Sequence, residues 1–196
     1  MGDLYDQIEE LQGMARVLTE DVERLRPRLG SRNPQDAVCD EEEMSRRLYV
    51  RAIFARIEAL VEQHKRLLLH LTKANVITLP AGAAEGLSER LYTFKDNGAV
   101  VEREQYLNLP RKLRAVYRAA GEGFGEALAG DFGGQGWEAF QSAIRVRDRL
   151  THPKTFDDCQ VDEDDLRQVD EAEVWYRALN NEFVRIARTY RTAHPW

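Results

Sequence analysis

Apolar residues recur with a helical period over most of this chain. Near the N-terminus their spacings alternate between four and three, which gives a period of about 3.5 residues over three heptads, the period of a coiled-coil seam. The members of this seam are Leu4, Ile8, Leu11, Ala15, Leu18, Val22 and Leu25. We therefore expect residues 1–26 to form a helix, packed either on its own bundle or against a second copy of the chain.

Further helical stretches follow a polar, proline-containing linker at residues 27–41. The longest is expected at about 41–76, and its apolar stripe comprises Met44, Leu48, Ile53, Ile57, Leu60, Val61, Leu67, Leu68 and Leu71. Other helices are expected at about 108–128, 136–151 and 163–192. This succession predicts an all-α protein, an antiparallel helical bundle over residues 42–196 that follows the N-terminal helix.

One segment breaks the helical series. Asp96-Asn97-Gly98 lies between Tyr92-Thr93-Phe94 and Ala99-Val100-Val101, two short runs rich in aromatic and β-branched residues. A polar Asn-Gly turn between such runs is typical of a β-hairpin. We expect a small hairpin that departs from the bundle, not a second domain.

Composition narrows the class of protein. No run of 18 uncharged apolar residues is present, so no membrane span or membrane partner is expected. The acidic N-terminus lacks the basic-then-apolar order of a signal peptide. Cys39 and Cys159 are far apart in sequence, which favours a reducing, cytoplasmic location without a disulfide framework or a cysteine zinc site.

The formal net charge of −6 is unevenly distributed. Residues 157–173 carry nine acids and one base, so the rest of the chain is slightly basic. Two basic clusters stand out: Arg111, Lys112, Arg114 and Arg118, and Arg145, Arg147, Arg149 and Lys154. Either cluster is a solvated helix face or a set of phosphate contacts. In the second cluster, Arg145, Arg149 and Lys154 are the weaker candidates for nucleic-acid binding.

Arg147 is the most informative residue of the chain. On a helical wheel of residues 136–151 it falls in the middle of the apolar face, whereas Arg145 and Arg149 point away. The apolar face comprises Trp137, Phe140, Ala143, Ile144 and Leu150. An inward guanidinium is costly unless an anion or a dense hydrogen-bond network meets it.

His152 follows Arg147 by five residues and precedes Pro153. Positions i and i+5 of a helix are about 140° apart, so an unbroken helix would not aim the two side chains together. Proline disfavours helical geometry at the preceding residue, so the helix should end at about Thr151 and release His152. Asp148 is placed to orient either partner, and the segment predicts a site for a phosphate and a proton.

The long helix at 41–76 offers supporting candidates. Glu58 and Glu62 lie near the flank of its stripe, and His64 lies on or beside it. A histidine in that position is more often a core residue than a catalytic one. The alternative to a catalytic site is a buried salt-bridge network in which Arg147 and His152 pair with Glu58 or Glu62. No cluster with metal-ligand spacing is evident, and no metal or cofactor is expected.

Four residues separate Arg147 from His152, and the first of them is polar. This spacing resembles the R-x4-6-H signature of HEPN domains, which are found in many prokaryotic toxins and defence proteins. The segment 45–58 also resembles the long early helix of such bundles, and the resemblance in architecture covers about residues 42–192. Lys154 stands where one toxin branch of that family carries a tyrosine.

The resemblance implies metal-independent RNA cleavage at a composite site in a homodimer, with an antitoxin or defence-system protein as a further partner. His152 would transfer the proton, and Arg147 would stabilise the phosphorane. Asp148 would hold these two side chains in place. The possible supporting residues are Thr151, Glu58, Glu62 and His64. Two alternatives remain open at this point. One is a catalytically inert HEPN-like interaction or dimerisation module, and the other is an unrelated helical protein.

Overall fold

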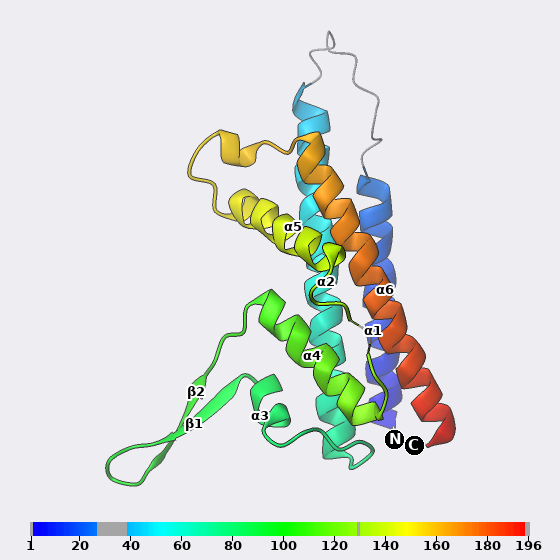
Figure 1. The fold of residues 1–196 in the computed structure, drawn as a ribbon, viewed down its shortest axis with the longest axis vertical. Coiled ribbons are helices and arrows are strands. Elements are labelled where there is room, and N and C mark those ends of the chain that lie inside the picture. Colours follow the sequence, from blue (N-terminus) through cyan, green and yellow to red (C-terminus); the bar gives the residue numbers. More distant parts are fainter. Residues whose placement is uncertain (1, 27–38, 129, 195–196) are drawn as a thin grey trace. The chain divides into compact units, whose positions relative to one another are not determined.

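The computed structural model describes residues 2–26, 39–128 and 130–194. In these residues the fold is a helical bundle with one small β-hairpin, which confirms the expected all-α class (Figure 1). The elements are α1 (Gly2–Leu25), α2 (Cys39–Lys73), α3 (Ala83–Leu87), β1 (Arg90–Phe94), β2 (Val100–Glu104), α4 (Leu109–Phe124), α5 (Gln135–Thr151), η1 (Asp157–Cys159) and α6 (Glu163–Ala193). Most of the expected linker at 27–41 lies outside the described residues, and its last three residues already belong to α2.

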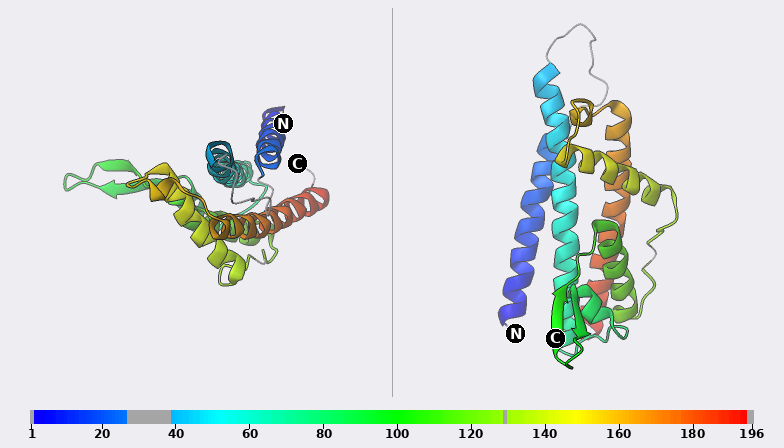
Figure 2. Two further views of the ribbon diagram at one scale, coloured as in Figure 1. Left: turned by 90° about the horizontal axis from the view of Figure 1, so that it is seen from above. Right: turned by 90° about the vertical axis from the view of Figure 1, so that its left-hand side faces the viewer.

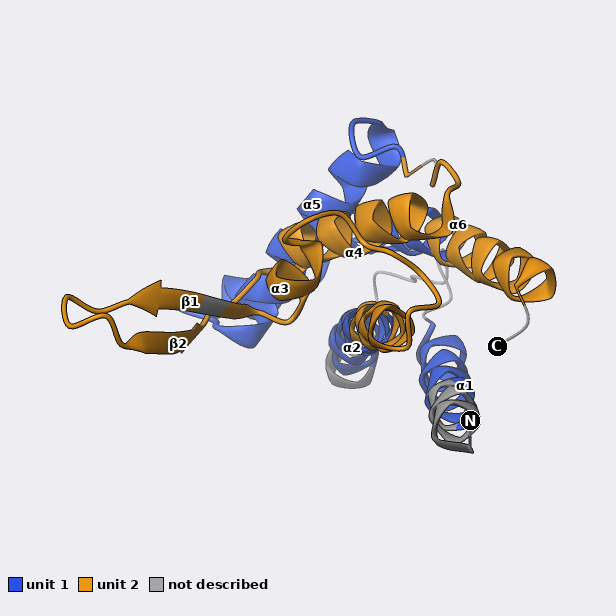
Figure 3. Ribbon diagram, turned by 90° about the horizontal axis from the view of Figure 1, so that it is seen from below, with its two compact units in different colours: residues 1–60, 131–177 blue, residues 61–130, 178–196 orange. Residues whose placement is uncertain are grey.

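The chain divides into two compact units (Figure 3). The first comprises residues 1–60 and 131–177, and the second comprises residues 61–130 and 178–196. Both α2 and α6 run through the two units. The division into residues 1–26, 27–41 and 42–196 expected from sequence stays a prediction. None of the described helices is long and apolar enough to cross a bilayer.

In the first unit, α2 and α6 run in the same direction. Arg46 near the start of α2 pairs with Glu163 at the start of α6, at 2.6 Å, and Arg56, about three turns later, pairs with Glu173, at 2.7 Å. α1 runs opposite to α2 (Figures 1 and 2). Within the antiparallel bundle expected over residues 42–196, α2 and α6 are therefore parallel, not antiparallel. The core of this unit contains Val22, Tyr49, Val50, Ile53, Phe54, Ile57, Trp137, Phe140, Ala143, Val146, Leu150, Val169, Ala172 and Tyr176.

The apolar stripe of α2 begins differently from the sequence-based expectation. Met44 and Leu48 are exposed by 48% and 38%, whereas Tyr49 and Phe54 are buried in their place. The Tyr49 hydroxyl donates a hydrogen bond to Asp170 at 2.5 Å. A tyrosine with an apolar ring and a bonded hydroxyl can therefore fill a core position, which the spacing of aliphatic residues alone does not predict. Burial, reinforced by this carboxylate, raises the pKa of Tyr49.

The second unit has an aromatic core that contains His64. The imidazole stacks on Phe183 with ring centroids 3.8 Å apart, and its Nδ1 lies 3.2 Å from the Tyr117 hydroxyl. Phe124 and Tyr190 extend the same cluster. Burial lowers the pKa of His64 to about 3, so the ring is neutral in the folded protein near neutral pH. His64 is thus a satisfied core histidine of the second unit.

Two helices end earlier than the apolar pattern predicts. α2 ends at Lys73 because Asn75 adopts a left-handed conformation (φ 56°), and the amides of Asn75 and Val76 bond back to Thr72 and Leu71. α4 ends at Phe124 in the same way, with Gly125 at φ 70°. Both are Schellman-type ends, in which a left-handed residue lets two amides satisfy the last free carbonyls.

The start of α6 matches the expectation. Asp162 accepts a hydrogen bond from the Asp165 amide at 2.8 Å, and Asp165 accepts one from the Asp162 amide at 3.1 Å. This reciprocal pair is a capping box, and the acidic residues that follow are favoured by the partial positive charge of the helix N-terminus. Much of the acidic run at 157–173 is therefore explained by local helix chemistry.

The expected hairpin is present. β1 and β2 are antiparallel, with Tyr92 opposite Glu102 and Phe94 opposite Val100. The connecting loop spans residues 95–99, and Gly98 takes the left-handed conformation (φ 79°) that its turn requires. Short helix α3, which precedes the hairpin, is not predicted by the apolar pattern because five residues are too few to show a period.

Candidate functional site

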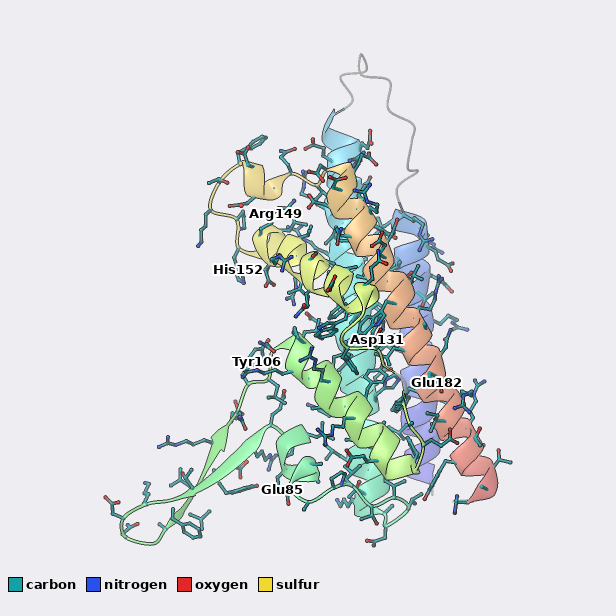
Figure 4. All side chains as sticks on the ribbon, viewed as in Figure 1. Glu85, Tyr106, Asp131, Arg149, His152 and Glu182 are labelled. Atoms are coloured by element: carbon teal, nitrogen blue, oxygen red, sulfur yellow. The ribbon has the colours of Figure 1, made fainter. Side chains whose placement is uncertain are left out.

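The candidate site lies at the C-terminal end of α5, in the first unit. The helix ends at Thr151, as the position of Pro153 predicts. His152 leaves the helix with φ −129° and ψ 59°, while its amide still bonds to the Asp148 carbonyl at 2.9 Å. Its imidazole is exposed where the chain enters the following loop (Figure 4). The ring is therefore accessible to a ligand.

Arg147 lies at the edge of the α5 apolar face, not in its middle. Its side chain is 25% exposed, and Val146 takes the buried position beside it, at 4% exposure. The guanidinium carbon lies 5.3 Å from the centroid of the Phe54 ring. A long arginine side chain can cover apolar surface with its stem and keep its head near water, which a wheel diagram does not represent.

Two carboxylates hold the Arg147 guanidinium. Nη2 lies 3.1 Å from Glu58 Oε1, and Nε lies 3.3 Å from Asp148 Oδ1. Nε is buried but has no well-aligned hydrogen-bond partner among the described residues. Glu58 and Asp148 are themselves 48% and 58% exposed. The guanidinium is thus oriented within one chain, and both it and its two carboxylate partners remain partly open to water.

A stripe on α2 faces this end of α5. Arg51, Phe54 and Glu58 follow each other at spacings of three and four, so they share one side of the helix. Arg51 Nη2 donates a hydrogen bond to the Leu150 carbonyl at 2.9 Å. Arg51 and Phe54 were not among the site residues predicted from sequence. Their spacing from Glu58 was the available signal.

The loop after His152 is held by a carboxylate. Asp158 accepts hydrogen bonds from the amides of Lys154 and Thr155, at 2.8 and 2.9 Å. These two amides are the leading causes that lower the pKa of Asp158, so its charged form persists at neutral pH. The chain that follows His152 and Pro153 is therefore tied into a defined turn.

The weaker nucleic-acid candidates differ in their surroundings. Arg149 forms an ion pair with Asp165 and donates to the Gln160 carbonyl at 2.7 Å. This corrects the expectation that it points freely to solvent, because the loop after α5 folds back over it. Arg145 is exposed and contacts Ser142, at 2.9 Å, and Lys154 is exposed.

The remaining supporting candidates have separate roles. Thr151 donates its hydroxyl to the Arg147 carbonyl at 2.8 Å, a bond within the last turn of its own helix. Glu62 pairs in the second unit with Lys65, at 2.8 Å, and with Lys112, at 3.6 Å. Of the acids considered from sequence, Glu58 and Asp148 are the ones that contact Arg147.

The described residues contain no group of three or more His, Cys, Asp or Glu side chains arranged to hold a metal ion. Comparisons of the chain with protein-family models, with curated proteins and with solved structures gave no match.

Proposed function

We propose that the chain is a metal-independent endoribonuclease of HEPN type, with Arg147 and His152 as its catalytic residues. The observation that carries the proposal is the end of α5. There an exposed histidine follows an arginine whose guanidinium is oriented by Glu58 and Asp148 and whose side chain is still 25% exposed. The R-x4-6-H spacing of the two residues supports the same assignment.

The proposed reaction uses the RNA 2′-hydroxyl as its nucleophile. His152 accepts the 2′-OH proton as the oxygen attacks phosphorus, and the bond to the 5′-oxygen breaks to leave a 2′,3′-cyclic phosphate. The leaving 5′-oxygen takes a proton from a second imidazole, which a homodimer supplies. Arg147 stabilises the negative charge that grows on the phosphorane oxygens. DNA lacks the nucleophile, so the reaction is selective for RNA.

The experiment that tests this proposal is incubation of the purified protein with mixed RNA in excess EDTA. Cleavage should persist, because neither the base nor the electrostatic stabilisation depends on a metal in this mechanism. Complete loss of cleavage on chelation would contradict it.

One observation favours the second candidate function, an inert interaction module. Arg147 and Glu58 form their ion pair within a single chain, as a structural cross-link would. If that were the reason for Arg147, its removal would destabilise the fold. The two functions therefore differ in a measurable stability.

Replacing Arg147 by methionine is expected to abolish cleavage and change the free energy of unfolding by no more than about 1 kcal/mol. Glu58, which loses its partner, is about half exposed and can be solvated, and ion pairs of this kind contribute little. Urea unfolding of the wild type and of Arg147→Met measures the difference. A loss on the order of 3–5 kcal/mol, typical of a broken buried pair, would favour the interaction module.

We also propose that the active form is a homodimer, with α1 as a candidate interface. The seam residue Val22 is buried within the chain, whereas Met14 and Val17, which lie outside the seam expected from sequence, are exposed by 41% and 54% and offer apolar surface to a partner. Light scattering at micromolar concentration should give twice the chain mass of 22.6 kDa. A monomer would contradict this proposal. A dimer that survives deletion of residues 1–30 would place the interface elsewhere.

RNA and an antitoxin or defence-system protein are the other proposed partners.

A further inference from the structure

Arg51 differs from the other arginines of α2 in the first unit. Arg46, Arg47 and Arg56 each have a carboxylate oxygen within 4 Å, at 2.6, 3.6 and 2.7 Å. Arg51 is exposed and has no carboxylate partner among the described residues; its one contact there is the Leu150 carbonyl. Its positive charge is therefore not balanced by a neighbouring acid.

The single contact of Arg51 fixes the position of that charge. Its Nη2 is anchored to a carbonyl two residues before His152 and three residues after Arg147, at 2.9 Å. A guanidinium has five N–H donors in a planar fork, so one bond to a carbonyl leaves most of them available. The anchored fork is thus held at the backbone segment that joins the two proposed catalytic residues.

The charge of Arg51 offsets a net negative charge at the site. Glu58 and Asp148 carry two negative charges against the one positive charge of Arg147. Without Arg51, an approaching phosphate would meet a net charge of about −1, which repels it. A cation at the C-terminal carbonyls of α5 also interacts favourably with the helix dipole, but that role alone requires no guanidinium. Planar, multi-donor binding of phosphate is the chemistry in which arginine excels.

We propose that Arg51 is a second phosphate-binding residue, which contacts the RNA backbone beside the scissile phosphate. This inference rests on the proposed ribonuclease function. Arg147 then stabilises the reacting phosphate, and Arg51 contributes to binding of the RNA strand. Removal of Arg51 should weaken RNA binding and raise KM, whereas kcat should stay close to the wild-type value.

The binding test uses His152→Ala protein, a labelled single-stranded RNA oligonucleotide and excess EDTA. Fluorescence anisotropy is followed over a series of salt concentrations, with and without Arg51→Gln. Loss of one phosphate contact should reduce the magnitude of the slope of log affinity against log salt by about 0.7, and the affinity at 0.1 M salt by about fivefold. Arg51→Lys keeps the charge and should restore most of the slope.

Arg185→Gln is the matched control. It makes the same charge change at an exposed arginine that lies outside both basic clusters and is already paired with Glu126 and Glu182, and it should leave the slope unchanged. Cleavage by the wild type together with an unaltered slope in Arg51→Gln would overturn the inference and leave the proposed function standing. A lowered kcat with an unaltered slope would also overturn it, because Arg51 would then act only by positioning α5. Failure of the wild type to cleave and of His152→Ala to bind would overturn both proposals.

Discussion

Replacing His152 by alanine is expected to slow RNA cleavage by at least about a hundredfold, the usual contribution of a general acid–base residue. The imidazole is exposed at the end of α5, and no described hydrogen bond of its ring supports the fold. Stability should therefore be nearly unchanged. Initial rates in EDTA and thermal melts of the two proteins measure both quantities.

His194→Ala is the control for this substitution. His194 is also exposed, but it lies at the end of α6 in the second unit, stacked on Tyr190. Its removal should leave the cleavage rate within about twofold of the wild type, since it is no part of the proposed chemistry. Equal rates for wild type and His152→Ala would remove His152 from the catalytic assignment.

The free energy of unfolding is expected to fall by about 2 kcal/mol between pH 7 and pH 5 through His64 alone. Burial lowers the pKa of His64 from 6.5 to about 3. The unfolded chain therefore binds more protons than the folded protein throughout this interval, and acid favours unfolding. The contribution is absent well above pH 6.5 and grows as the pH falls towards 3.

His64→Phe isolates this effect, because phenylalanine keeps an aromatic ring against Phe183 and cannot be protonated. Urea unfolding of both proteins at pH 7 and pH 5 gives the comparison. The loss of stability on acidification should be about 2 kcal/mol smaller in the variant. An equal loss in both proteins would show that His64 is not held neutral in the folded state.

The helices themselves could be predicted from sequence, but two of their ends could not. Apolar periodicity located α1, α5 and α6 to within one or two residues of their bounds. Asn75 and Gly125 end α2 and α4 early through left-handed backbone geometry, a local effect that competes with a periodic pattern still present beyond them. A residue that favours the left-handed conformation therefore predicts the end of a helix better than the position of the last apolar residue does.

The site could be predicted only in part. Pro153 placed the end of α5 correctly, because its effect is local and steric. The partial exposure of Arg147 and its contact with Phe54 depend on which face of α2 packs against α5, and a single helical wheel contains no such information. The pairing of Arg149 with Asp165 likewise depends on how the loop after α5 returns to α6.

The most direct test of the central claim is the chemistry of the RNA ends produced in excess EDTA. A defined RNA is incubated with the wild type and with an Arg147→Met/His152→Ala protein purified in the same way, which controls for a contaminating nuclease. The account predicts cleavage by the wild type alone, with 2′,3′-cyclic phosphate and 5′-hydroxyl ends. Products with uniform 3′-hydroxyl ends, or equal cleavage by the double variant, would contradict it.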